Sequence, residues 1–311
     1  MSQEGSAISQ ETHYFDQRYL YAFASQAEVY QHVRTQAIKE DRTDDRINAI
    51  LAAWTAVRPR VMQLVQNEAG LPDTIDVGSI PGEHEARIAE IAADPLFQKA
   101  FTGATFGVVE IDKLVAAQRV VKLAYVQRLV ATLPEHASMA ELIELCVSSN
   151  RPMDPIQHLE LGPSVHAFSS PNSDVRFLGA FAKDLQADDL RYAQGGLPTA
   201  AIIVFVGYGS PAISVYKVGS RVVLNNGFHR VYALRSRGIT AIPVVIRTVQ
   251  NPSIEFPQEI AGIPRDYLLN TPRPTLIKDF LEDDFTTQIR VQERIKTVML
   301  QVVPNQYDVP A

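Results

Sequence analysis

The sequence has few of the features that mark secreted or membrane proteins. Its 311 residues include one cysteine, Cys146, so no disulfide can form within the chain. No run of 18 apolar residues occurs, so no transmembrane helix is expected. The opening stretch MSQEGSAISQETHYFDQ has neither a basic region nor an apolar segment, so no secretory signal is expected. These absences predict a cytoplasmic protein that does not contact a membrane.

Common ligand-binding motifs are also missing. The sequence contains no zinc-ligand spacing, no P-loop and no GxGxxG motif. His158, His166 and His229 follow no known ligand spacing, and we predict no metal site. Cys146 lies in an apolar run, which favours a packed thiol over a nucleophile. The net charge of −6 disfavours DNA as a partner, because duplex binding depends largely on neutralising phosphates.

Acidic residues are absent from one long window of this net negative chain. None occurs in the 65 positions between Asp189 and Glu255, where about seven would be expected from 35 in 311. Part of this gap is ordinary, because buried strands exclude acids. The window carries seven basic residues, which make it a candidate footprint for an anionic ligand: Arg191, Lys217, Arg221, Arg230, Arg235, Arg237 and Arg247.

The composition that remains is that of a globular protein with a sizeable core. Apolar residues make up 46% of the chain and charged residues 21%. Residues 25–104 read as a helical region. Within it, 44–67 carries one apolar stripe, which Pro59 is expected to kink or split. This helical region is a candidate surface for a protein partner. Residues 1–24 are expected to be flexible or loosely docked.

The stretch 220–245 (SRVVLNNGFHRVYALRSRGITAIPVV) reads as strand, turn, helix and strand. Gly227 is expected to open the helix and Gly238 to close it. A glycine turn that leads into a helix leaves backbone N–H groups unpaired, and such a place binds anions. The ordinary alternative stays open: His229 is then a packed core histidine and Arg230 a surface arginine.

The sequence VVLNNGFHRVYAL resembles the phosphate-binding box of the ParB/sulfiredoxin-like superfamily, in which a strand ends in Gly-x-His-Arg and opens a helix. Val108–Leu114 resembles the family's opening strand and its Lys-Leu pair. Gln118-Arg119 stands where ParB-like proteins often carry a Gln-x-Arg pair, and 238–245 resembles the closing strand. The resemblance covers about a quarter of the chain, at 107–132 and 200–247. It implies an α+β fold, in which the helical N-terminal region is followed by a nucleotide-binding domain of bacterial type with a small mixed sheet.

The resemblance implies that the box cradles the phosphates of a nucleotide, CTP or ATP with Mg²⁺. Gly227 would supply the close turn beside Asn226, and His229 and Arg230 would contact phosphate oxygens. Arg119 would be a second clamp if its segment folds over the same cleft. A phosphorylated small molecule would then be the ligand.

The sequence departs from the family at Phe228, where sulfiredoxins have cysteine and ParB proteins have glutamate. Sulfiredoxin activity is therefore disfavoured, and nucleotide turnover is left in doubt. An NTPase or a small-molecule kinase still needs a carboxylate. Glu110 and Asp112 are the nearest candidates, and Asp112 can equally cap a turn.

The rest of the chain divides around this box. We expect the ParB-like domain at 105–250, with an insertion at about 133–199 in which 174–184 forms a helix. Residues 200–206 (AAIIVFV) read as a central, buried strand. Residues 251–311 form a C-terminal extension. Within it, 285–302 alternates partly at period two and suggests a β-hairpin, although a helix also fits.

Three functions follow from these patterns. The leading hypothesis is a regulatory or NTP-dependent protein that binds a nucleotide or another phosphorylated ligand. The second is a non-enzymatic assembly or interaction protein with a degenerate ParB-like domain. The third is a DNA-associated partition-like factor, which the negative charge disfavours.

Overall fold

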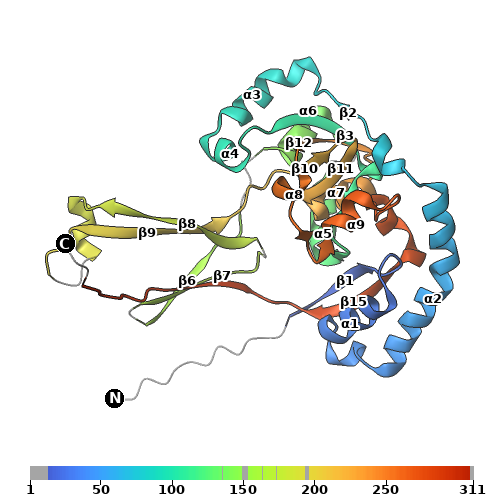
Figure 1. Cartoon of the computed structure of the whole chain (residues 1–311), viewed down its shortest axis with the longest axis horizontal. Helices are drawn as coiled ribbons and strands as arrows, with labels where there is room; N and C mark the ends of the chain where they lie inside the picture. Colours follow the sequence, from blue (N-terminus) through green and yellow to red (C-terminus); the bar gives the residue numbers. More distant parts are fainter. Residues whose placement is uncertain are drawn as a thin grey trace. The chain divides into compact units, whose positions relative to one another are not determined.

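A computed structural model describes residues 13–134, 136–148, 153–162, 164–172, 174–192 and 196–308 of the chain (Figure 1). The chain divides into two compact units. Unit 1 consists of Met1–Asn150 and Pro211–Glu293, and unit 2 of Arg151–Ser210 and Arg294–Ala311. Helices and mixed sheets are both present, so the α+β class expected from the sequence is confirmed.

Unit 1 is built on a six-stranded mixed sheet with the order β2-β3-β12-β10-β11-β4. The hairpin β10–β11 turns at Gly219, whose φ of 59° suits glycine. β12 lies parallel to β10 and antiparallel to β3, while β11 lies parallel to β4. The strands are β2 (Val77–Gly78), β3 (Thr105–Glu110), β4 (Val115–Ala116), β10 (Ser214–Val218), β11 (Arg221–Asn226) and β12 (Ala241–Val249).

The core of unit 1 covers both faces of this sheet. Successive residues of β11 belong to two different clusters: Val222 and Leu224 pack into the larger one, and Val223 packs into the other. Because side chains alternate across a strand, the apolar run of β11 buries both its faces. Five helices of unit 1 lie between or after these strands in the sequence: α5 (Leu123–Thr132), α6 (Met139–Cys146), α7 (Phe228–Ser236), α8 (Pro252–Glu255) and α9 (Arg265–Asn270).

The long helix α2 (Asp44–Asn67) runs unbroken through Pro59, so of the expected kink or split, the split is wrong. Proline removes one helical N–H, which leaves the carbonyl of Thr55 without that donor. Pro59 and Thr55 are both exposed, so water can reach this part of the helix.

Among the described residues, no helix combines the length and the apolar character needed to cross a bilayer. The other N-terminal helices are α1 (Gln26–Gln36), α3 (Glu85–Ala93) and α4 (Pro95–Ala100).

Both ends of unit 1 join in a second sheet, with the order β15-β1-β5. β1 (Tyr14–Leu20) pairs with β15 (Thr286–Gln292) and with β5 (Val120–Lys122), so these residues are not the loosely docked segment expected from the sequence. Residues 1–12 lie outside the described part. The expected hairpin at 285–302 is also wrong: β15 and β16 (Lys296–Gln301) are strands, but they pair with β1 and β7 instead of with each other.

Unit 2 contains two small antiparallel sheets, β16-β7-β6 and β8-β9. The helix expected at 174–184 is wrong, because these residues form β8. The expectation that 200–206 is a central, buried strand is also wrong. Within the part of the chain that the structure describes, β9 pairs only with β8, in a two-stranded sheet, and it carries exposed apolar side chains. The strands are β6 (Gln157–Gly162), β7 (Val165–Ser170), β8 (Val175–Asp184) and β9 (Ala200–Tyr208).

Candidate functional site

Gly227 opens α7 as the sequence predicts, and the structure shows why glycine stands there. Its φ of 92° is left-handed, and a Cβ at this position would lie 2.6 Å from Cγ1 of Ile213. Both constraints exclude other residues. Gly238 follows the helix with φ 86°, as expected for the residue after its end. The chain therefore turns tightly from β11 into α7, directly against Ile213.

The first turn of α7 is only partly satisfied by its own backbone. The amides of Arg230 and Val231 donate to the Gly227 carbonyl at 2.9 and 3.0 Å. No side chain caps the helix at Gly227. Among the described residues, no acceptor contacts the amides of Phe228 and His229. Of the backbone N–H groups that were expected to bind an anion at this turn, these two still lack an acceptor among the described residues.

His229 is held by unit 1 as a neutral acceptor. Its Nε2 accepts a hydrogen bond from the backbone N–H of Lys122 at 3.1 Å, and its ring meets Tyr125 edge-on at 5.4 Å. Burial of the imidazole, with the nearby charge of Lys122, lowers the pKa of His229 to about 4. The ring is therefore uncharged at neutral pH and cannot act as a cation toward a phosphate.

Acid should reveal this buried, neutral histidine. The pKa of His229 is lowered from 6.5 in the unfolded chain to about 4 in the folded chain, so the stability it contributes is complete above pH 6.5 and is lost as the pH falls toward 4. The loss amounts to about 3 kcal/mol at most. We expect His229→Gln to flatten the pH dependence of the free energy of unfolding in this window, measured by urea denaturation.

His32 is the matched control for that measurement. Burial, with the charge of Arg119, also lowers the pKa of His32 to about 4. His32→Gln should therefore remove a similar share of the pH dependence, and the double variant should remove both. An unchanged pH profile in His229→Gln would show that the imidazole is not buried in its neutral form.

Arg230 is bonded to the backbone of unit 1. Its guanidinium donates to the Leu145 carbonyl at 2.9 Å and to the Pro211 carbonyl. These acceptors lie at the end of α6 and just before β10, so the side chain ties two connections to α7. Hydrogen bonds of a charged donor are worth about 1.5–3 kcal/mol. The residue that most resembles a phosphate clamp thus has a structural role.

Two other arginines of the acid-free window are paired with carboxylates from outside it. Arg221 is buried and holds Asp73 at 2.7 and 2.8 Å, and its Nη1 also donates to three carbonyls at 268–271. Arg235 holds Asp112 at 2.7 and 3.0 Å. Their carboxylate partners come from distant parts of the sequence, which a local charge count cannot reveal. Two of the seven basic residues of the window are therefore neutralised by acids that lie outside it.

The remaining candidates are placed as follows. The segment of Arg119 does reach α7, because the neighbouring Lys122 donates to His229. Arg119 itself pairs with Glu28 at 2.6 Å and lies 5.8 Å from the ring centre of Tyr267. The Nδ2 of Asn226 donates to the Ala212 carbonyl at 3.0 Å. The weak catalytic candidates are both in ion pairs: Asp112 with Arg235, and Glu110 with Lys113 at 2.9 Å.

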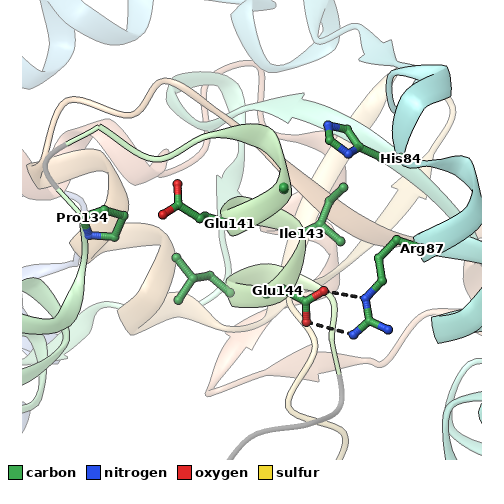
Figure 2. A pocket seen from close by; sticks show the side chains of 8 residues that line it. His84, Arg87, Pro134, Glu141, Ile143 and Glu144 are labelled. Carbon is green, nitrogen blue, oxygen red and sulfur yellow. Dashed lines mark hydrogen bonds and ion pairs between the residues drawn. The ribbon is translucent and has the colours of Figure 1, made fainter.

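A pocket of about 430 Å³ lies between α3 and α6, and no sequence motif pointed to it (Figure 2). Arg87 projects into it from α3 and pairs with Glu144 of α6 at 2.5 and 3.0 Å. Arg87 also holds Glu90 at 2.8 Å, so two carboxylates share its charge. The pocket shares Leu145 with the anchor of Arg230. It is lined by His84, Arg87, Pro134, Ala140, Glu141, Ile143, Glu144 and Leu145.

Within the described ranges, no group of three or more histidine, cysteine, aspartate or glutamate side chains is placed to hold a metal ion. His158 and His166 are 3.2 Å apart, between Nε2 and Nδ1, on the paired strands β6 and β7 of unit 2. Comparison with protein-family models, with curated proteins and with solved structures gives no match.

Proposed function

We propose that the chain is a non-enzymatic interaction protein, in which a ParB-like box serves the fold instead of a nucleotide. The observation that carries this proposal is the bonding of the box itself. Arg230 donates to two backbone carbonyls, and His229 accepts from a backbone amide as a neutral ring. A nucleotide would have to displace these contacts before either side chain could reach its phosphates.

A second observation supports the same function. The second unit exposes large apolar side chains on both of its sheets, among them Leu159, Phe177 and Ile202 at 56, 51 and 73% exposure. Scattered apolar side chains are normal on a surface, but a group of them on one small unit marks an interaction site. An interaction protein needs such a surface, and a nucleotide-binding domain does not.

Calorimetric titration tests the proposal directly. CTP and ATP, each with and without Mg²⁺, should give no saturable heat with the full chain. Saturable binding of either nucleotide that is lost in Arg230→Ala would contradict the proposal, provided that the variant remains folded by circular dichroism.

The second candidate function is binding of a phosphorylated ligand through the backbone alone. It is favoured by the amides of Phe228 and His229, which have no acceptor among the described residues. A ligand held this way would leave Arg230 on its carbonyls. Saturable nucleotide binding that survives Arg230→Lys with unchanged affinity would support this second function over the first.

A further inference from the structure

β9 is an apolar strand whose outer edge lacks a partner. Its sequence, AAIIVFVGY, contains no charge, and within the described ranges it pairs only with β8. Ile202, Val204 and Phe205 are 73, 39 and 50% exposed. An exposed apolar edge is a template for pairing with another strand.

The charges of the hairpin lie on the other strand. β8 carries Arg176, Lys183 and Asp184, whereas natural proteins place such charges on edges that must stay unpaired. Two of the three are neutralised locally, Arg176 by Asp174 and Lys183 by Asp189. A protected β8 edge and an unprotected β9 edge indicate which side of the hairpin is open to a partner.

The same pattern indicates which partner fits. An uncharged edge gives no attraction for an acidic or a basic protein, and it gives no like-charge repulsion against itself. Antiparallel pairing of one edge with its own copy about a two-fold axis is self-complementary. Both faces of the β8–β9 sheet would then continue into the second copy. Within each copy, the rings of Phe181 and Phe205 already stack on this sheet, with their centres 5.7 Å apart.

We propose that two copies of the chain associate through β9, which pairs antiparallel with β9 of the second copy to form a four-stranded sheet β8-β9-β9-β8. This inference rests on the proposed interaction function and names its partner. If the nine-residue strands pair over their full length, Val204 of each copy lies opposite Val204 of the other. Ile202 then lies opposite Val206, and Ala200 opposite Tyr208.

Cross-linking tests this register. Cys146 is fully buried, so Val204→Cys adds the one accessible thiol to the described part of the chain. Mild oxidation should convert this variant to a covalent dimer. Ile254→Cys is the matched control, because Ile254 is 82% exposed on α8 of the other unit and should stay monomeric under the same oxidation.

Sedimentation equilibrium tests the association itself. The wild-type chain should form a dimer, and Ile202→Lys should weaken it by at least about tenfold, which corresponds to about 1.4 kcal/mol. Leu159→Lys, on β6 of the same unit and 56% exposed, should leave the dimer intact. Both positions are exposed, so neither lysine needs to be buried in the isolated chain.

Three results would overturn the inference. The first is a wild-type chain that stays monomeric at every concentration reached. The second is a dimer that is not weakened by Ile202→Lys and does not cross-link through Val204→Cys. A monomer that binds phosphatidylcholine vesicles and loses that binding in Ile202→Lys would assign the edge to lipid instead. Nucleotide binding lost in Arg230→Ala would contradict the proposed function and leave dimer formation through β9 unaffected.

Discussion

Replacing Asp279 by alanine is expected to lower the free energy of unfolding by about 3–5 kcal/mol. Asp279 and Arg273 are both buried and joined by two hydrogen bonds of 2.5 and 2.7 Å. Glu68 accepts from the same guanidinium at 2.8 and 3.1 Å, so Arg273 links the end of α2 to residues near 279. Without Asp279, a buried guanidinium would lose half of its carboxylate partners. Urea denaturation measures the loss.

A double variant separates the cost of an unpaired charge from the loss of the ion pair. Arg273→Met with Asp279→Leu removes both charges and should be less destabilised than Asp279→Ala alone, because no buried charge is left without its partner. Lys278→Ala is the control for a partly exposed ion pair: it removes one 2.7 Å contact with Glu68 and should cost about 1 kcal/mol or less. A double variant less stable than Asp279→Ala would show that the pair contributes net stability of its own.

Gly227→Ala is expected to cost about 2–5 kcal/mol, the second of the largest effects. Alanine in a left-handed conformation costs about 1–2 kcal/mol. Forcing its Cβ to within 2.6 Å of Ile213 adds a packing penalty of about 1–3 kcal/mol. Denaturant unfolding of the full chain measures the sum.

Gly238→Ala is the control for the packing penalty. Gly238 has nearly the same backbone, with φ 86° against 92°, but nothing lies within 4 Å of its Cβ position. It should therefore show the conformational cost alone. Ile213 is fully buried, so Ile213→Ala is itself destabilising, but it should cost less in the Gly227→Ala variant than in the wild-type chain. Equal losses in the two glycine variants would contradict the close approach of Gly227 and Ile213.

The local parts of the fold could be read from the sequence. The hairpin β10–β11, the helix that begins after Gly227 and its end at Gly238 depend on turn residues and periodicity, which act over a few positions. The cap of α1 by Ser25 is of the same kind. The Ser25 side chain accepts a hydrogen bond from the amide of Glu28, and the Glu28 carboxylate accepts one from the amide of Ser25. Such signals need no knowledge of distant partners.

Long-range pairing could not be read in the same way. The partial alternation at 285–302 indicates the strands at 286–292 and 296–301, but their partners β1 and β7 are far away in the sequence. A strand that is apolar on both sides looks buried whether it lies in a central sheet or at the edge of a hairpin. β9 belongs to the second kind, so its burial was wrongly predicted.

The candidate site illustrates the same limit for chemistry. The sequence correctly placed Gly227, His229 and Arg230 at the start of one helix. It could not show that carbonyls at 145 and 211 hold the arginine, because backbone acceptors carry no sequence signature. It also could not show that Asp73 and Asp112 neutralise two arginines of the acid-free window.

The central claim is that Arg230 stabilises the fold through its two backbone contacts and does not bind a nucleotide. Thermal unfolding of the wild-type chain and of Arg230→Ala, with and without nucleotide, tests this claim most directly. Wild type and Arg230→Ala are each melted alone and with an excess of CTP and Mg²⁺. We predict that the variant melts lower than wild type by the same interval in both buffers, because it loses two hydrogen bonds that the nucleotide does not affect. Equal melting temperatures without nucleotide, and a gap that opens only when CTP is added, would contradict the account.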